Sequence, residues 1–500
     1  MHARCGAPVL VRILPFAHGA RLYSCLGSRI GVLAYATPGD EFMAQTRIAV
    51  VSVYFTLFDA QMPDDFRARQ EARAVRLEAA LASSHEVVAF TGLLASDAEA
   101  ERANRMLRDA APDVVVFAPA MVAPPSYAIT ALADVDAPTV LWNAPAVDRL
   151  GEDLDQASAH EHTSMLGVLM LANVLQRRDQ PVHVLTARPE DPAAMDRLHR
   201  TIRALAAARR LRGRTALRIG DPFPGYLNIE ADAAQLSRLG IREQSVTREE
   251  LEATYDSIAE DQLAKLRAEL AGHGWRGDAD ERGVRLAASL RVLAHRHDAV
   301  CGTVNCHGPL IRGNENIGVP ACLGTSVCTA AGVPFSCTGD QPAAIALTLA
   351  RALAGSVLYC EFYAPELATD MLLVANGGEG DTGLAANGVE IVPSSHYPGV
   401  RGAGAALAFE LPPGPVTMIS LTPLGKRWRV VWALGELVEA RYPRMRAPNA
   451  MFRFSSPSRA GTLDRWIASG ATHHNAMTPG HLAIELPIVA AALGIESHQI

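Results

Sequence analysis

The chain has 500 residues, 49% of them hydrophobic and 20% charged, with a formal net charge of −7. Because single hydrophobic cores stop growing at roughly 250–300 residues, this length predicts two or three domains, and the composition is typical of packed globular proteins. The net charge and the lack of a block of basic residues argue against nucleic-acid binding. The longest apolar run, Met165 to Leu175, is shorter than the about 18 residues of a membrane span, so we expect a soluble protein with no nucleic-acid or membrane partner.

The first 42 residues contain four arginines and no acidic residue before Asp40, which is formally the pattern of a transit peptide. Met43, however, opens almost directly onto a predicted strand that begins near Arg47. We interpret residues 1–42 as a disordered or non-native extension, and we expect the true start to be Met43 and the location to be cytoplasmic.

From Ile48 onward, short apolar runs alternate with amphipathic segments, the pattern of a parallel, doubly wound sheet. The predicted strands are residues 48–55, 86–90, 114–117 and 139–142, and the predicted helices lie near 64–82 and 97–109. We place this N-terminal α/β domain at residues 43–178.

A second set of the same kind begins at Val182, after a polar linker, and continues with a helix near residues 193–210 and a strand at 216–219. The charged stretch 247–270 is predicted to be a helix whose start is marked by Thr247. We place this central α/β domain at residues 179–355.

After about residue 355, short strands are separated by Gly/Pro turns, with few helices before the C-terminus. The predicted strands are residues 371–375, 389–392, 405–409, 416–421 and 429–432. The sequence therefore predicts a mainly antiparallel, β-barrel-like C-terminal domain at residues 356–500, following the two doubly wound α/β domains.

Polar residues that punctuate apolar segments of the central domain are the first candidates for a site. Ligands of open α/β sheets bind at the carboxyl ends of strands, so we expect His307, Glu315, Asp340 and Glu361 to converge there. Taken separately, each of these residues is more often a cap or turn residue, and Asp340 suits the N-terminus of a helix in any fold.

Two adjacent histidines near the C-terminus, His473 and His474, are the second candidates. Neighbouring side chains of an extended segment point to opposite faces, so at most one of them can bind a given metal. Together with Glu361, that histidine would begin the carboxylate and imidazole ligand set that Mn²⁺ or Mg²⁺ prefers. Six of the eight cysteines fall between Cys301 and Cys360 without a Cys-x-x-Cys pair, so we favour reduced core thiols over a zinc site.

Three further segments have both a functional and a structural interpretation. His160 and its neighbours precede a predicted helix, and we favour a capping role over a catalytic one. The glycine-bounded turns at 376–381 and 394–399 either present a side chain to a cleft or only turn the chain. Arg312 could receive a substrate carboxylate in a bidentate fork, although such an arginine is more often a solvated loop residue.

Five segments occur in the same order as motifs of the L-arabinose and L-fucose isomerase superfamily, which the chain resembles from about Ile48 onward. They are Gln156-Ala-Ser-Ala-His160, Arg218-Ile-Gly-Asp221, Gly332-Val-Pro-Phe-Ser-Cys-Thr-Gly-Asp340, His396-Tyr-Pro-Gly-Val-Arg-Gly402 and Trp466-Ile-Ala-Ser-Gly-Ala-Thr-His-His474. The resemblance implies two Rossmann-like domains and a C-terminal β-barrel. It also implies a Mn²⁺-dependent aldose–ketose isomerase whose active sites form between subunits of a homo-oligomer, a trimer or hexamer.

In that chemistry a carboxylate moves a proton between C1 and C2 through an enediol, and the metal stabilises the developing negative charge. The resemblance aligns the first of the paired metal-site glutamates with Thr338 and keeps the second as Glu361. It aligns a metal-site histidine with Asn376 and keeps the C-terminal one as His473 or His474, so the implied metal ligands here are Glu361, His473 and His474, for Mn²⁺ or another divalent ion.

The site residues expected on this basis fall into two groups. The catalytic candidates are Asp340, Glu315 and Glu361, with Glu379 or Asp381 as further possible replacements for the lost glutamate, and the candidates for binding the sugar are His160, His307, Arg312, Asn376 and His396. Two alternatives stay open: a non-catalytic sugar-binding or regulatory homologue, and a lyase or epimerase acting on a modified sugar or a sugar acid.

Overall fold

The computed structural model describes residues 44–500, apart from 156–158, 395–403, 440–441, 443 and 457–458. The predictions for residues 1–42, for the start at Met43 and for His396 therefore lie outside the described residues. Domain boundaries at residues 178 and 355 stay predictions.

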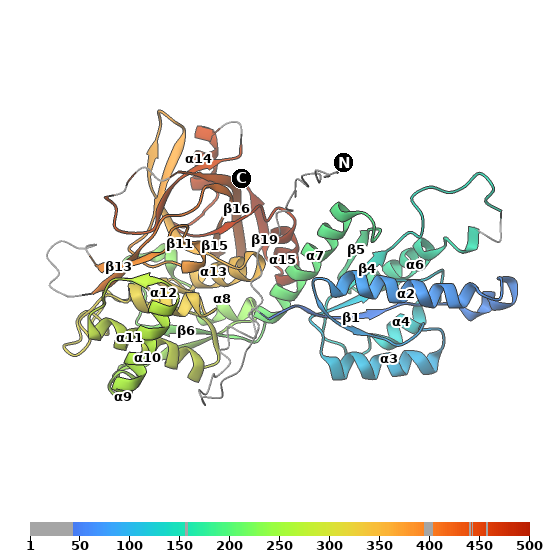
Figure 1. Ribbon diagram of the computed structural model, residues 1–500, viewed down its shortest axis with the longest axis horizontal. Coiled ribbons are helices and arrows are strands. Elements are labelled where there is room, and N and C mark those ends of the chain that lie inside the picture. The colour runs from blue at the N-terminus through green and yellow to red at the C-terminus, as the bar shows by residue number, and fades with distance from the viewer. Residues whose placement is uncertain (1–43, 156–158, 395–403, 440–441, 443, 457–458) are drawn as a thin grey trace, which may run out of the picture. The chain divides into compact units, whose positions relative to one another are not determined.

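The N-terminal part contains a five-stranded parallel sheet with the order β2-β1-β3-β4-β5 (Figure 1). Its strands are β1 (Arg47–Val51), β2 (Glu86–Ala89), β3 (Val114–Phe117), β4 (Thr139–Asn143) and β5 (Val182–Thr186). The helices are η1 (Thr56–Gln61), α2 (Phe66–Ala82), α3 (Asp97–Ala110), α4 (Pro125–Ala131), α6 (Ser164–Gln176) and α7 (Pro192–Leu211).

Alternate residues of these strands pack into two separate hydrophobic clusters. Ala49 and Val51 pack with residues of α3, α4 and α6, whereas Ile48 and Val50 pack with residues of α2 and α7. Because successive side chains of a strand point to opposite faces, helices cover both faces of the sheet. This explains why the strands appear in the sequence as uninterrupted apolar runs.

A second parallel sheet has four strands in the order β10-β9-β6-β7. These strands are β6 (Thr215–Ile219), β7 (Arg242–Val246), β9 (Ala299–Val304) and β10 (Phe335–Cys337). The helices of this part are η2 (Leu227–Ile229), α8 (Ala233–Arg238), α9 (Arg248–Ser257), α10 (Glu260–Gly272), α11 (Glu281–Arg296), α12 (Cys322–Ala330) and α13 (Gln341–Ala354).

The stretch predicted as one helix over 247–270 is in fact two helices, α9 and α10. Thr247 is the N-cap of α9, as expected, and its hydroxyl accepts from the Glu250 amide at 3.1 Å. Ala259 is extended, and its amide donates to the Gln262 side chain at 2.8 Å, which caps a new helix.

The C-terminal part is a closed antiparallel barrel of six strands, with β19 added parallel to β16. The ring runs β15-β18-β11-β12-β17-β16 and returns to β15. The strands are β11 (Leu358–Glu366), β12 (Met371–Ala375), β15 (Gly414–Leu424), β16 (Arg427–Val438), β17 (Asn449–Phe454), β18 (His474–Pro479) and β19 (Glu496–Gln499). The prediction of parallel α/β sheets followed by an antiparallel barrel is confirmed.

The remaining elements flank the barrel. A three-stranded sheet, β14-β13-β8, joins β13 (Val389–Pro393) and β14 (Ala405–Ala408) to β8 (Trp275–Arg276), and η3 (Thr382–Leu384), α14 (Arg459–Ala468) and α15 (Glu485–Leu493) complete the described elements.

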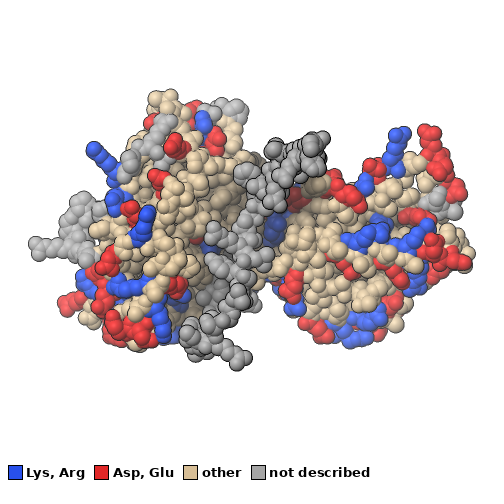
Figure 2. Space-filling view, in the orientation of Figure 1, with Lys and Arg blue, Asp and Glu red and all other residues tan. Residues whose placement is uncertain are grey.

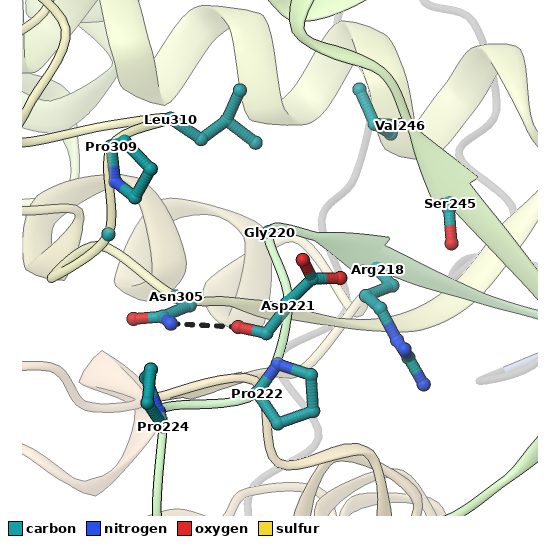
Figure 3. Close-up of a pocket in the computed structure, with 11 residues that line it drawn as sticks. Arg218, Gly220, Asp221, Pro222, Pro224, Ser245, Val246, Asn305, Pro309 and Leu310 are labelled. Carbon is teal, nitrogen blue, oxygen red and sulfur yellow. Dashed lines mark hydrogen bonds between the residues drawn. The ribbon is translucent and has the colours of Figure 1, made fainter.

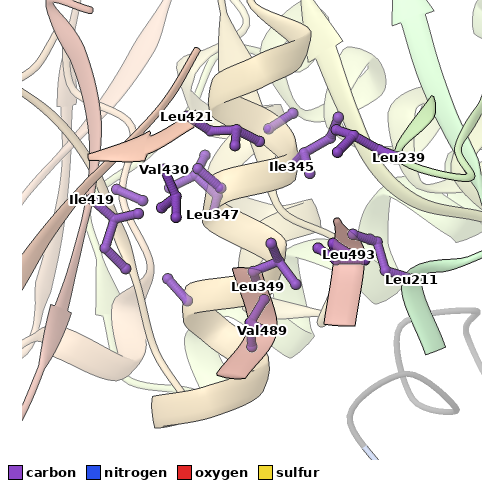
Figure 4. Close-up of a cluster of buried hydrophobic side chains, with 14 of the residues drawn as sticks. Leu211, Leu239, Ile345, Leu347, Leu349, Ile419, Leu421, Val430, Val489 and Leu493 are labelled. Carbon is purple, nitrogen blue, oxygen red and sulfur yellow. The ribbon is translucent and has the colours of Figure 1, made fainter. Parts of the chain in front are cut away.

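Helix α13 is the centre of the largest hydrophobic cluster. Its Ile345, Leu347 and Leu349 pack with Leu421 of β15 and Val489 of α15, among others (Figure 4). A fully buried aliphatic side chain contributes roughly 1.5–3 kcal/mol to stability. This shared core therefore fixes α13 against both the second sheet and the barrel.

Among the residues that the structure describes, no helix combines the length and the hydrophobicity that crossing a membrane requires. Acidic and basic side chains are intermixed over the visible face (Figure 2).

Candidate functional site

A small cavity of about 50 Å³ lies where the loops that follow β9 and β10 meet the barrel strands β11 and β18. Its reactive lining side chains are Cys306, His307, Arg312, Cys322, Cys337, Tyr359, Glu361, Glu379 and His474. The carboxyl ends of parallel strands are where open α/β sheets bind ligands, and here the barrel supplies the opposite wall.

His474 is held from both sides by carboxylates. Its Nδ1 lies 2.8 Å from Oδ2 of Asp340, the N-cap residue of α13, whose Oδ1 accepts from the Ala343 amide at 2.8 Å. Asp340 is fully buried and its carboxylate accepts from Nδ1, and Nε2 of the same ring faces Oε1 of Glu361 at 3.7 Å. The β11–β18 pairing places Glu361 directly opposite His474.

The two carboxyl groups in the lining, Glu361 and Glu379, both have raised pKa values. Burial raises the pKa of Glu361, and the charge of His474 partly offsets this effect. Glu379 is only 4% exposed, and burial, followed by the negative charge of Cys306, raises its pKa to about 7. At neutral pH Glu379 therefore populates both its protonated and its charged form.

Two cysteines of the lining, Cys306 and Cys337, are hydrogen-bonded to each other. A hydrogen bond from Cys337, with support from the positive charge of Arg312, lowers the pKa of the Cys306 thiol to about 6. The same hydrogen bond and burial raise the pKa of Cys337 well above its usual range. Burial, followed by the charge of Glu379, raises the pKa of Cys322.

Tyr359 contributes a hydroxyl group that has no hydrogen-bond partner among the described residues, although the side chain is only 4% exposed. Its ring lies 4.9 Å from the ring of His474. Burial raises its pKa well above the usual value, so the hydroxyl stays protonated and can donate to a ligand oxygen in the cavity.

Of the residues predicted from the sequence, His307, Arg312, Glu361, Glu379 and His474 line the cavity, and Asp340 lies directly behind His474. The others lie elsewhere. Glu315 is exposed, His160 lies beside the ring of Phe58, and His473 hydrogen-bonds to Asn228 at 2.8 Å. Asp381 receives the guanidinium of Arg351 and the Val357 amide, which is a structural role.

Asn376 and Thr338, which the resemblance aligns with metal ligands, use their side chains in hydrogen bonds within the protein. The Asn376 amide is fully buried, donates to the carbonyls of Tyr359 and Glu379, and accepts from the Gly378 amide at 2.9 Å. The Thr338 hydroxyl donates to its neighbour's carbonyl at 2.7 Å.

In the described part of the chain, the group of three potential ligand atoms within 4.8 Å of one another comes from Cys306, His307 and Cys337. Manganese prefers oxygen donors. The donor set in this arrangement therefore does not match manganese.

Sequence reasoning missed Tyr359 and the convergence of the cysteines. The sequence did contain a signal for Tyr359, because residues two apart on a strand share a face and Tyr359 lies two positions before the predicted site residue Glu361 on β11. The sequence contained no signal that Cys306 and Cys337 converge, because nothing in the spacing of the cysteines indicates that β9 and β10 are neighbouring strands.

A second, larger cavity of about 350 Å³ lies at the carboxyl ends of β6, β7 and β9 (Figure 3). The strand order reverses between β6 and β9, which is where open parallel sheets bind ligands. Asp221, Ser245 and Asn305 line it, and Nδ2 of Asn305 donates to the Asp221 carbonyl at 2.7 Å. The volume suits a small ligand.

Residues 356–496 match the family model of the L-arabinose isomerase C-terminal domain. The L-arabinose isomerase of Acidothermus cellulolyticus is 25% identical over 347 residues, covering 63% of this chain and 66% of that protein. The L-arabinose isomerase of a Nocardioides species is 26% identical over 353 residues, covering 65% and 67%.

The L-arabinose isomerase of Yersinia enterocolitica is 32% identical over 93 residues, covering 18% of this chain and 19% of that protein. The similarity thus spans about two thirds of the length of the first two relatives. The chain is therefore similar to L-arabinose isomerases, in its C-terminal part through the domain model and over a longer stretch through these relatives.

Proposed function

We propose that this chain is a sugar isomerase that interconverts an aldose and a ketose through an enediol. The relatives named L-arabinose isomerase support an enzyme of this class. The observation that carries the proposal is the presence of two carboxyl groups with raised pKa values, Glu361 and Glu379, in one cavity with the protonated Tyr359 hydroxyl.

The reaction moves one proton between C2 and C1 and another between the two oxygens. In the proposed mechanism, the Glu379 carboxylate takes the proton from C2 and returns it to C1. A base whose pKa lies near the working pH combines a sufficient charged fraction with an easy return of the proton. Glu361, opposite His474, exchanges the second proton between O2 and O1.

The enediolate that forms between these steps carries negative charge on oxygen. Tyr359 donates its hydroxyl to that oxygen, and the guanidinium of Arg312 stabilises its charge from the cavity wall. Asp340 is a positioning residue, because it holds His474 in the tautomer whose Nε2 faces Glu361.

The cavity is smaller than the roughly 300 Å³ of a pocket that holds a whole small molecule. In this proposal only the C1–C2 end of the sugar enters it. Specificity for the rest of the sugar then depends on groups outside the cavity.

The test is incubation of the purified full chain with L-arabinose, L-fucose and other pentoses and 6-deoxyhexoses in D₂O, followed by NMR. Enediol chemistry incorporates solvent deuterium at C1 or C2. Glu379→Gln should lower turnover by about 10²–10⁴-fold and abolish the rise of kcat/KM with pH through about pH 7. The matched control is Glu436→Gln, because Glu436 is an exposed carboxylate on β16.

Equal turnover and equal deuterium incorporation in Glu379→Gln and Glu436→Gln would contradict the assigned role of Glu379. Thermal stabilisation by a sugar, without turnover or exchange, would favour the non-catalytic sugar-binding homologue instead.

Arg312 supports a second candidate, a lyase or epimerase acting on a sugar acid, because its guanidinium lies in the same cavity as the two carboxyl groups. Aldonates and uronates belong in the same screen. Turnover of a sugar acid, but of no neutral sugar, would select this candidate.

Manganese, a homo-oligomer of three or six chains and a cytoplasmic location stay predictions. Light scattering of the purified chain measures the oligomeric state directly.

A further inference from the structure

Three thiol and imidazole side chains gather on one wall of the small cavity. Cys306 and His307 follow β9, and Cys337 is the last residue of β10, where it pairs in parallel with Val304 of β9. This pairing brings the end of β10 beside the loop that carries the other two residues. One ligand atom from each of the three lies within 4.8 Å of the others.

Two thiolates and one imidazole are a ligand set for zinc and other thiophilic ions, not for manganese or magnesium. Zinc binds sulfur at about 2.3 Å and nitrogen at about 2.0–2.1 Å, so tetrahedral ligand atoms stand roughly 3.5–3.8 Å apart. The three atoms therefore need to approach one another by at most about 1.3 Å to hold such an ion.

The loop that carries two of these ligands is supported by its neighbours. Asn305 accepts from the His307 amide at 3.2 Å and donates to the Asp221 carbonyl at 2.7 Å. The ring of His307 packs edge-on against Phe223, with 5.4 Å between the ring centres. Outer contacts of this kind orient metal ligands and limit the cost of ordering them.

The fourth direction of such a site faces the cavity. Structural zinc sites take four protein ligands, whereas sites with three keep a position for water or substrate. The nearby Cys322 thiol lies 3.8 Å from the Gly377 carbonyl, and it is not part of the three-atom group. Glu361 and Glu379 line the same cavity as the three ligands.

We propose that Cys306, His307 and Cys337 bind a zinc-type divalent cation whose open coordination position faces the cavity shared with Glu361 and Glu379. This site goes beyond sugar isomerisation and does not rest on it. The site would place a thiolate-bound ion near Thr338 and Asn376. These are the two residues that the resemblance aligns with a metal-site glutamate and a metal-site histidine.

The test uses the full chain, purified under reducing and anaerobic conditions, stripped of metal and then titrated with Zn²⁺, Co²⁺ or Mn²⁺. We expect one equivalent of Zn²⁺ and, with Co²⁺, a thiolate-to-metal charge-transfer band. Zn²⁺ should compete with Co²⁺ at this site, whereas Mn²⁺ should not. No sugar is present, so failure of this test and failure of the isomerase proposal are distinguishable.

Cys306→Ser, Cys337→Ser and His307→Gln should each weaken Co²⁺ binding at least 100-fold and alter the charge-transfer band. Cys301→Ser is the matched control, because Cys301 is a fully buried cysteine of β9, the strand that precedes Cys306, and lies outside the three-atom group. Circular dichroism identifies variants that fail to fold. If a serine variant fails to fold, the His307→Gln variant tests metal binding in its place, because His307 is only partly buried and its substitution disturbs the core less.

Three results would overturn the proposal: the absence of the charge-transfer band, zinc binding that survives all three substitutions, or recovery of Cys306 and Cys337 as a disulfide from the reduced protein.

Discussion

A buried pair of histidines predicts that the protein loses stability in mild acid. Nε2 of His85 lies 3.0 Å from Nδ1 of His199 on α7, so one ring donates and the other accepts, and the hydrogen bond is lost when both rings are protonated. Burial, followed by the positive charges of His199 and Arg203, lowers the pKa of His85 to about 3. Burial and Arg203 also lower the pKa of His199, against the opposing charge of Asp196.

The magnitude follows from the difference between the pKa values of the folded and unfolded chain. An unfolded histidine has a pKa of about 6.5, so the unfolded state takes up a proton first as the pH falls. The stability that neutral His85 contributes is therefore fully present above pH 6.5 and is lost progressively toward pH 3. Between pH 7 and pH 5, the free energy of unfolding should fall by about 2 kcal/mol from this group alone.

The assay is urea unfolding, followed by tryptophan fluorescence, at pH 7, 6 and 5. His85→Gln removes the titrating group, so its unfolding free energy should fall by about 2 kcal/mol less than that of the wild type over this range. His273→Gln, which changes an exposed histidine at the end of α10, should behave as the wild type does. The same pH dependence in all three proteins would refute the reasoning.

Three further substitutions test packing, pairing and backbone strain by thermal unfolding. Arg200→Met leaves the buried carboxylate of Glu485 without its bidentate partner, whose nitrogens lie at 2.6 and 2.7 Å. We expect the free energy of unfolding to fall by about 3 kcal/mol, and an unchanged melting temperature would contradict this expectation. Gly302→Ala places a Cβ against the ring of Phe335 in the second sheet, and the free energy of unfolding should fall by about 1–3 kcal/mol. An equally stable variant would mean that the Phe335 ring can move aside. Thr338 is a β-branched residue whose φ of 58° lies in the left-handed region, which strains the backbone. Thr338→Asn should therefore raise the free energy of unfolding by about 1 kcal/mol. A lower melting temperature would show that the hydrogen bond of the Thr338 hydroxyl contributes more than the strain costs.

The buried elements were the most predictable from the sequence, because burial on two faces leaves an uninterrupted apolar run. Val114–Phe117 and Met371–Ala375 were predicted with the bounds that the structure has. The break between α9 and α10 was not predicted, because it depends on one side chain, Gln262, that caps the Ala259 amide inside a stretch of uniformly helical composition.

The candidate site was predictable only in part. His307 and Glu361, which the rule for the carboxyl ends of parallel strands predicted to converge, line one cavity, although Glu361 lies on the antiparallel barrel strand β11. The rule could not indicate which of two adjacent histidines turns inward, because that choice depends on Asp340, a residue far away in the sequence. The neighbours of Cys306 likewise follow from the order of strands in the sheet, which no spacing in the sequence encodes.

The core around α13 bears on how the molecule can be divided for experiments. The region that matches the family model begins at residue 356, just after α13 ends at Ala354. The hydrophobic cluster nevertheless runs from Ala204 of α7 through α13 to Leu493 of α15. A fragment cut at residue 356 would expose the barrel surface that α13 covers, and it would lack Asp340. We therefore expect that the barrel, although it is a unit of sequence similarity, does not fold as an independent unit.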